Sequence, residues 1–249
     1  MKSILTVILL GLFLLVSTSS LSNKDSIFHM GVKSLSDGDF KQAIAFLEED
    51  LTTNPSFEVF YNLGIAYGEI ERWNDSYWAS EAALKWKPSD NNAIFNAQFA
   101  LSKVDDKITW NHPYSWTKRV VLSLSPLVWY VLSLIVSIIS AALIFYLIVN
   151  KKKNNFFQFS RIFLVIILPL LFLFVFAGFT ASNHYSNTDY IIPKHTNVET
   201  FANENGIKLK ESLKLGMRYP YITETEGWIQ LLYSDNRPVW VEKKDVRWY

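Results

Sequence analysis

The chain has 249 residues, half of them hydrophobic, and its 24 Lys and Arg side chains nearly balance its 23 Asp and Glu side chains. This balance means that the chain lacks the excess of basic residues typical of proteins that bind nucleic acid. The chain has no cysteine, which excludes disulfides, thiolate metal sites and a cysteine nucleophile. Outside its long apolar runs, the sequence is long enough for two small domains.

The first residues have the layout of a secretory signal peptide. Lys2 precedes an apolar core, and small polar residues lead up to Ser20, after which we expect cleavage. The alternative is that residues 1–20 remain as an uncleaved anchor. In both cases the chain from Asp25 onward is expected on the outer side of the cytoplasmic membrane.

Residues 25–104 carry an internal repeat. Gly31 recurs 33 residues later as Gly64, and Pro55 recurs at the same spacing as Pro88. The pattern resembles the tetratricopeptide repeat, a helix–turn–helix unit of about 34 residues with small residues where its helices cross. The resemblance implies two full units and a third, partial one. Three positions depart from the usual residues of that repeat, namely Ser34, Asp50 and Ser76.

The resemblance also implies a groove lined by the first helix of each unit. His29, Asn62 and Asn96 share one repeat position, where an Asn amide can bond to the backbone of an extended peptide. The alternative is that the aromatic side chains nearby only pack between helices. No Lys or Arg set is present to clamp a terminal carboxylate. The predicted partner-binding residues are Phe28, His29, Tyr61, Asn62, Ile65, Phe95, Asn96 and Phe99.

An acidic run, Glu48–Asp50, ends the second predicted helix of the first unit. Paired carboxylates can serve acid–base chemistry. Three adjacent ones are more typical of a solvated helix face, which is the interpretation that we favour.

Two long apolar runs, residues 120–150 and 162–181, contain no charged side chain. Each approaches or exceeds the roughly 20 residues that a helix needs to cross about 30 Å of hydrocarbon. We therefore predict a two-helix transmembrane hairpin. Ion and proton pathways usually need an ionisable group inside the membrane, so a transporter or pump is disfavoured.

The loop between the two spans, residues 151–161, sets the predicted orientation. It carries Lys151, Lys152, Lys153 and Arg161, against Lys118 and Arg119 on the opposite flank of the first span. Because basic residues are retained on the cytoplasmic side, the loop is expected inside and both flanking domains outside. This agrees with the signal peptide. The linker, residues 105–119, is expected at the bilayer surface because it holds the aromatic residues Trp110, Tyr114 and Trp116.

Residues 187–249 change to short runs separated by turn residues, which predicts a small barrel or sandwich. The expected strands are Tyr190–Pro193, Val198–Phe201, Gly206–Glu211, Arg218–Thr223, Gly227–Tyr233 and Pro238–Val241. Several features of this segment resemble the bacterial SH3-like domain. They are a turn at Gly216, a strand start at Gly227 and Trp228, a tight turn near Asp235, and a Trp-Val pair before a closing turn at Asp245–Val246. Pro238 departs from that family, which commonly has Gly there.

Four aromatic residues of this segment, Tyr219, Tyr221, Trp228 and Trp240, are candidates for a ligand cleft. The alternative is that they are core residues. For Trp228 and Trp240 a core role is favoured, because a barrel this small needs large apolar anchors.

No catalytic constellation is evident. The four histidines are His29, His112, His184 and His195, and no set of carboxylates completes a metal-ligand spacing around them. The sequence has no Gly-rich phosphate loop and no G-x-S-x-G elbow. It therefore predicts no enzyme, no metal and no other cofactor.

The predicted fold class is a multidomain membrane protein with an all-α tetratricopeptide helical repeat, a two-helix transmembrane hairpin and a small all-β SH3-like barrel. In this order, after a signal peptide, the modules resemble the BatE family of the Bacteroides aerotolerance operon group. The resemblance covers the whole chain and depends on the arrangement more than on any one motif. It implies an inner-membrane protein that works with membrane proteins carrying von Willebrand A domains and with an AAA-type ATPase, in envelope integrity or stress tolerance.

The predicted function is a non-enzymatic protein–protein interaction scaffold at the periplasmic face of the inner membrane. The repeat groove would hold a segment of a partner protein, and the hairpin would raise the effective concentration of both outer domains. The alternative is a cell-wall tether or sensor that binds peptidoglycan through the SH3-like domain.

Overall fold

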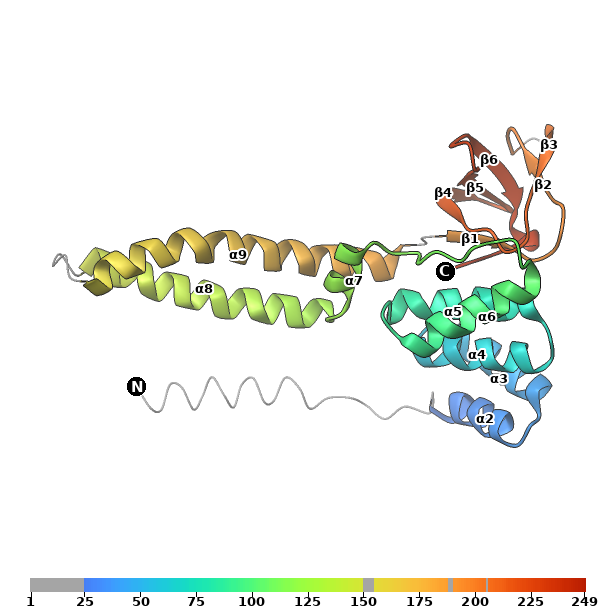
Figure 1. Cartoon of the computed structure of the whole chain (residues 1–249), viewed down its shortest axis with the longest axis horizontal. Coiled ribbons are helices and arrows are strands. Elements are labelled where there is room, and N and C mark those ends of the chain that lie inside the picture. Colours follow the sequence, from blue (N-terminus) through green and yellow to red (C-terminus); the bar gives the residue numbers. More distant parts are fainter. Residues whose placement is uncertain (1–24, 150–154, 188–189, 205) are drawn as a thin grey trace.

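The computed structural model describes residues 25–149, 155–187, 190–204 and 206–249. The expected signal peptide, residues 1–20, and the three lysines of the expected cytoplasmic loop lie outside this range. The described chain has three units: a helical unit α2–α6, a long helical hairpin α8–α9, and a sheet of strands β1–β7 (Figure 1). The prediction of a helical unit, an apolar hairpin and a small all-β unit is confirmed at this level.

The helices of the first unit begin where polar side chains cap their free backbone N–H groups. Asp39 accepts a bond from the N–H of Gln42, and Asp90 accepts bonds from the first turn of α6. Ser56 starts α4 in the same way. The helices are α2 (Asp25–Ser36), α3 (Phe40–Leu51), α4 (Phe57–Glu69), α5 (Trp73–Trp86) and α6 (Asn91–Val104).

The repeated glycines mark close helix contacts. A Cβ at Gly31 would lie 2.8 Å from Leu47 Cγ, and a Cβ at Gly64 would lie 2.8 Å from Ser80 Oγ. Gly31 thus lets α2 approach α3, and Gly64 lets α4 approach α5, one helix pair later. The 33-residue recurrence in the sequence has this packing as its physical reason.

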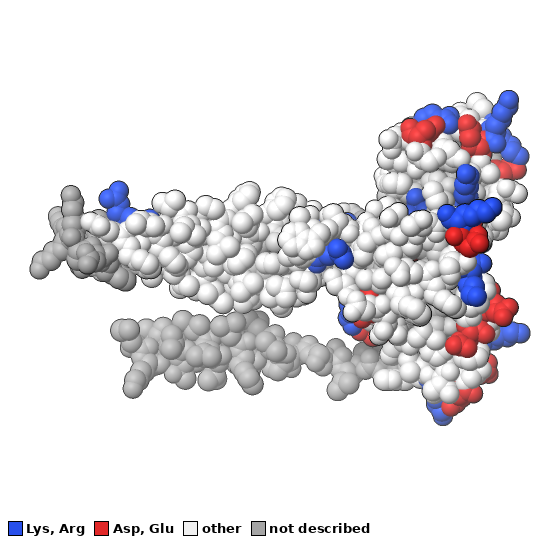
Figure 2. Space-filling model, viewed as in Figure 1, with Lys and Arg blue, Asp and Glu red and all other residues white. Residues whose placement is uncertain are grey.

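Two helices of the hairpin, α8 (Pro126–Val149) and α9 (Asn155–Ser186), are long and apolar enough to span a membrane. At 1.5 Å per residue, α8 is about 36 Å long. Only 11% of the apolar window in α8 and 17% of that in α9 is buried inside the structure, so most of these apolar side chains face outward. Figure 2 shows charged side chains over the helical and strand units and few along the visible face of the hairpin.

The bounds of the hairpin differ from the expected ones. Val120, the expected start of the first span, lies in a short helix, α7 (Trp116–Leu122). The first long helix starts only at Pro126, because Ser123–Ser125 interrupt the helix and proline suits a first helical position. The second helix begins at Asn155, inside the expected loop. The two long helices pack through small residues: Ser140, Ala177 and Ala181 are buried there, and a Cβ at Gly178 would lie 2.8 Å from Tyr130.

The strand unit is one antiparallel sheet in the order β3-β2-β6-β5-β4-β1-β7. In this pairing order it is an open sheet with β3 and β7 as its edges; the sequence predicted a small barrel or sandwich. Its central core includes Ile191, Leu213, Ile229 and Val241. The strands are β1 (Tyr190–Pro193), β2 (Val198–Phe201), β3 (Lys208–Leu213), β4 (Tyr219–Thr225), β5 (Trp228–Leu232), β6 (Pro238–Glu242) and β7 (Val246–Trp248).

Six of these strands lie within two residues of their expected positions. The seventh, β7, was not predicted; a 3-10 turn, Lys243–Asp245, leads into it where the sequence suggested only a closing turn. β7 pairs with β1 and ends between the strand unit and the helical unit (Figure 1). This last strand brings the two units into contact.

Candidate functional site

One face of the helical unit contains a hollow of about 420 Å³ between α4 and α6. Four of the eight predicted partner-binding residues line it: Ile65, Phe95, Asn96 and Phe99. Phe95 is 64% exposed and Phe99 is 44% exposed. Large aromatic side chains that lie together and are this open to solvent suggest a contact surface for another molecule.

The rings in this hollow are arranged in contact with one another. Phe95 stacks on Phe99 with centroids 6.1 Å apart, and Trp73 meets Phe99 edge-on at 5.7 Å. The Lys103 ammonium lies 5.3 Å from the centre of the Phe99 ring. Glu69 and Glu71 line the hollow beside α4. The hollow therefore offers an aromatic wall for an apolar side chain and carboxylates for a neighbouring basic one.

The other predicted groove residues do not line this hollow. The Asn62 amide donates to the carbonyl of Glu58 in its own helix at 2.8 Å. Tyr61 stacks on Phe57 with centroids 5.4 Å apart. Phe28 and His29 lie on α2 with their ring centres 5.9 Å apart. Of the three residues expected in line, His29, Asn62 and Asn96, only Asn96 faces the hollow.

In the strand unit, the four predicted aromatic residues divide between two environments. Tyr219 is buried and its hydroxyl accepts a bond from the Lys214 N–H at 2.9 Å, and Tyr221 packs against the same core. Trp228 and Trp240 are half-buried and alternate with the core residues of β5 and β6. Since successive strand side chains point to opposite faces, these two Trp lie on the outer face, where Trp228 meets Phe201 edge-on at 5.0 Å.

A buried carboxylate that the sequence analysis did not single out joins three segments. Glu81 of α5 is fully buried and accepts bonds from Arg218 Nη1 at 2.8 Å and from the Tyr249 hydroxyl at 3.0 Å. The Trp110 indole N–H of the linker donates to it as well. Burial alone would lower the pKa of Arg218, but the charge of Glu81 raises it above its usual value. The helical unit, the linker and the strand unit are thus joined at one ion pair.

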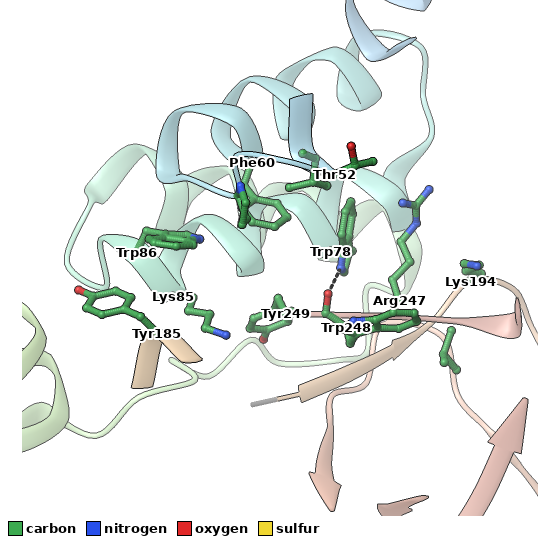
Figure 3. Close-up of a pocket in the computed structure, with 13 residues that line it drawn as sticks. Thr52, Phe60, Trp78, Lys85, Trp86, Tyr185, Lys194, Arg247, Trp248 and Tyr249 are labelled. Atoms are coloured by element: carbon green, nitrogen blue, oxygen red, sulfur yellow. Dashed lines mark hydrogen bonds between the residues drawn. The ribbon is translucent and has the colours of Figure 1, made fainter. Parts of the chain in front are cut away.

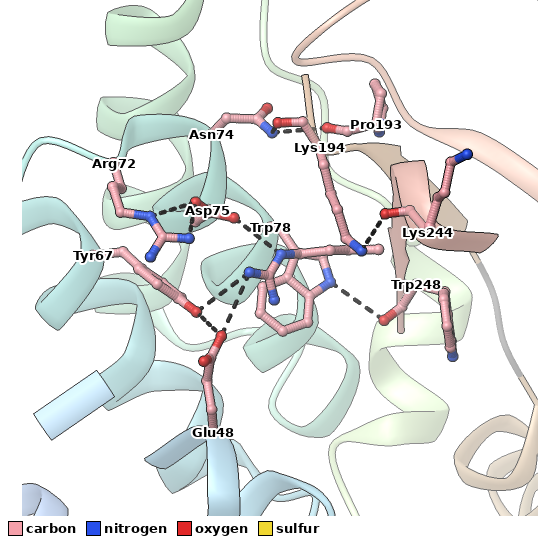
Figure 4. Close-up of polar contacts among 11 residues, drawn as sticks. Glu48, Tyr67, Arg72, Asn74, Asp75, Trp78, Pro193, Lys194, Lys244 and Trp248 are labelled. Carbon is pink, nitrogen blue, oxygen red and sulfur yellow. Dashed lines mark hydrogen bonds and ion pairs between the residues drawn. The ribbon is translucent and has the colours of Figure 1, made fainter. Parts of the chain in front are cut away.

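A second polar contact lies beside it (Figure 4). Arg247 Nε of β7 lies 2.9 Å from Asp75 Oδ1 of α5, and the guanidinium carbon lies 4.4 Å from the ring centre of Trp78. The Trp78 indole N–H donates to the carbonyl of Trp248 at 3.3 Å. The Asn74 amide donates to the carbonyl of Pro193 at 2.7 Å. The start of α5 therefore holds both β7 and the loop after β1.

The base of the hairpin also packs on α5. The ring of His184, near the end of α9, lies 3.1 Å from the Lys85 carbonyl, and Trp86 stacks on Tyr185 with centroids 5.4 Å apart. Tyr114 meets His184 edge-on at 5.0 Å and is buried. Helix α5 is therefore in contact with the hairpin at one end and with the strand unit along its length.

Two aromatic residues of the linker take part in the junction between the units. Trp110 donates to Glu81, and Tyr114 packs on His184. The acidic run is not a solvated face throughout: Asp50 is buried, 3% exposed, and accepts a bond from the Asn54 amide.

The sequence held one local signal for the missed site. Glu81 lies in the run Trp-Ala-Ser-Glu-Ala-Ala-Leu of α5, among small and apolar residues. A carboxylate there must be paired if the helix is buried on all sides. The sequence around Glu81 does not identify Arg218 or Tyr249 as its partners.

The described residues contain no group of three His, Asp or Glu placed to hold a metal ion. Both ring nitrogens of His112 and Nε2 of His184 contact backbone groups. No protein-family profile, curated protein or solved structure matches the chain.

Proposed function

We propose that the chain is a membrane-anchored, non-enzymatic scaffold whose helical unit binds a segment of a partner protein. The observation that carries this proposal is the exposed aromatic hollow at Phe95 and Phe99, on the face made by α4 and α6. The strand unit occupies a different side of the helical unit, along α5, and so leaves the hollow open. Interfaces of this kind use a few aromatic anchors surrounded by polar groups.

In this proposal the helical unit is a tetratricopeptide stack and the strand unit is an SH3-like domain. The recurrence of Gly31 and Gly64 at close helix contacts supports the first assignment. The hairpin crosses the inner membrane twice, and the two other units lie on the periplasmic side. Partners are membrane proteins with von Willebrand A domains, as the likeness to the BatE family implies, in a complex for envelope integrity or stress tolerance.

The test uses tagged full-length protein purified from gently solubilised membranes, with bound proteins identified by mass spectrometry. Phe95→Glu with Phe99→Glu should abolish recovery of the partner, because two charges replace the aromatic wall. The control changes two exposed apolar residues of the strand unit, Ile207→Glu and Ile222→Glu, which are 60% and 40% exposed. If the hollow variant recovers the same partners as the control, the hollow is not the binding site.

A second candidate function is peptidoglycan binding by the strand unit. It is supported by the half-buried Trp228 and Trp240 on the outer face of the sheet, with Phe201 beside them. Trp combines a large apolar ring with a polar N–H, which suits a surface that contacts both apolar and polar groups of a ligand. Full-length protein in micelles should sediment with purified cell wall, and Trp240→Ser should weaken this more than Trp116→Ser, a change outside the strand unit. Failure of the unmodified protein to sediment excludes this function.

A further inference from the structure

A cavity of about 610 Å³ lies where the three units meet. Helices α3, α4 and α5 form one wall and β7 forms the other, with the end of α9 at one extremity (Figure 3). Its size is within the range of about 300–1,000 Å³ that is typical of small-molecule sites. It is distinct from the aromatic hollow between α4 and α6, with which it shares no lining residue.

The cavity has apolar walls and three cationic side chains in its lining. Rings of Phe60, Trp78, Trp86 and Tyr249 line it, together with Lys85, Lys194 and Arg247. None of the described residues that line it is acidic. Asp75 and Glu48 pair with Arg247 from outside the lining, and the Lys85 ammonium donates to the carbonyl of Asn187.

Two of the three cations lie at one end of the cavity, and Lys85 lies toward the end with Trp86 and Tyr185 (Figure 3). Trp86 and Tyr185 lie at one end, and Lys194 and Arg247 lie at the other (Figure 3). The Lys194 ammonium donates to the carbonyl of Lys244 at 2.6 Å. Burial first, and then the neighbouring charge of Arg247, lowers the pKa of Lys194. The carboxylates of Asp245, Asp75 and Glu48 act in the opposite direction, and an anion beside these two cations would favour their charged forms further.

The apolar end is continuous with the hairpin. Tyr185 lines the cavity and is also the last residue of the apolar window Gln158–Tyr185 in α9. If the hairpin spans a bilayer, this end of the cavity lies at the membrane surface, where aromatic side chains gather. A molecule with an acyl chain could enter from the bilayer and extend its head away from it.

We propose that this cavity binds one anionic phospholipid, with its phosphate beside Lys194 and Arg247 and the upper part of an acyl chain along Trp86 and Tyr185. The inference rests on the membrane placement of the hairpin in the proposed function, and on no other part of it. The lipid would seal the junction between the helical unit and β7. A phosphate that meets both cations explains the selectivity for a negative head group.

The experiment uses full-length protein in non-ionic detergent, with lipid retention measured by native mass spectrometry. The probes are phosphatidylglycerol and phosphatidylcholine with identical chains, and inorganic phosphate as competitor. We expect one phosphatidylglycerol per chain, retained at least tenfold more strongly than phosphatidylcholine. Equal retention of the two lipids, or displacement by inorganic phosphate at equal concentration, overturns the proposal.

Matched variants locate the lipid. Lys194→Gln should reduce the preference at least tenfold, whereas Lys244→Gln, which changes a neighbouring exposed lysine outside the lining, should leave it unchanged. Thr52→Trp should fill the cavity and abolish retention, whereas Thr53→Trp, at a residue outside the lining, should not. Equal effects within either pair overturn the assignment.

A further measurement does not depend on the folding of these variants. Chain-brominated phosphatidylglycerol should quench the fluorescence of the unmodified protein more than brominated phosphatidylcholine does. Trp86→Phe should remove this difference, and an unchanged difference contradicts the predicted position of the chain. None of these readouts needs a protein partner, so failure here leaves the proposed binding hollow standing, and loss of partner capture leaves the lipid site standing.

Discussion

The buried pair between Arg218 and Glu81 should dominate the stability of the junction between the helical and strand units. The side chain of Glu81 is 0% exposed and that of Arg218 is 16% exposed. Arg218→Met would leave the carboxylate buried with neutral donors such as Trp110 and Tyr249 and no cation. Removal of one partner from a buried ion pair costs about 3–5 kcal/mol, so we expect a loss of that size in the free energy of unfolding.

The assay is urea unfolding of full-length protein in detergent micelles, followed by tryptophan fluorescence. The control is Lys87→Met, which removes the partner of Glu58 at 2.8 Å from a pair whose side chains are 52% and 54% exposed. An exposed pair of this kind contributes about 0–1 kcal/mol. Adding Glu81→Gln to Arg218→Met should recover part of the loss, because no buried charge then remains. If Arg218→Met is no more destabilising than the control, the buried pair does not hold the units together.

Three further predictions concern titration and packing. Burial raises the pKa of Tyr77 and Tyr249 well above the ordinary value, so the folded state keeps both protonated. The free energy of unfolding should therefore fall above about pH 10, by up to about 1.4 kcal/mol per pH unit for each tyrosine. In melting curves recorded at several pH values, Tyr77→Phe should reduce this slope. Burial lowers the pKa of His112 in the folded state. Its contribution to folding stability is therefore complete above about pH 6.5 and is lost as the pH falls through the lower pKa of the folded state. Melting curves of His112→Gln in acid should lack this loss of stability. In the hairpin, Gly178→Leu should cost about 1–3 kcal/mol by overpacking, measured by protease resistance in micelles, whereas Val175→Leu on the exposed face should not.

The parts of the fold that depend on local sequence could be predicted. The apolar hairpin follows from the length and continuity of two runs without charge, and the helical unit follows from Gly31 and Gly64, each of which fixes a contact within its own helix pair. The start of the first span was placed too early, because hydropathy does not register the break before Pro126. Strand positions followed from turn residues, but β7 did not, since a three-residue strand exists only through its pairing with β1.

The contacts between the units could not be predicted, because they join residues far apart in the chain. Glu81 meets Trp110 across 29 positions, Arg218 across 137 and Tyr249 across 168. No periodicity encodes such pairs, and a Glu between alanines only indicates that some partner exists. The candidate groove was predicted in part: Phe95, Asn96 and Phe99 share one helix face, whereas the Asn62 amide bonds to the Glu58 carbonyl in its own helix.

Helix α5 is the element through which the proposed sites would influence each other. Trp73 at its start lines the aromatic hollow, and Asp75, two residues later, pairs with Arg247 of β7. The other end of the helix packs on the hairpin through Trp86. A partner that displaces Trp73 would therefore act two residues from the contact that holds β7, and β7 forms a wall of the cavity proposed to bind lipid. By linkage, any change that the lipid makes in partner affinity must equal the change that the partner makes in lipid affinity.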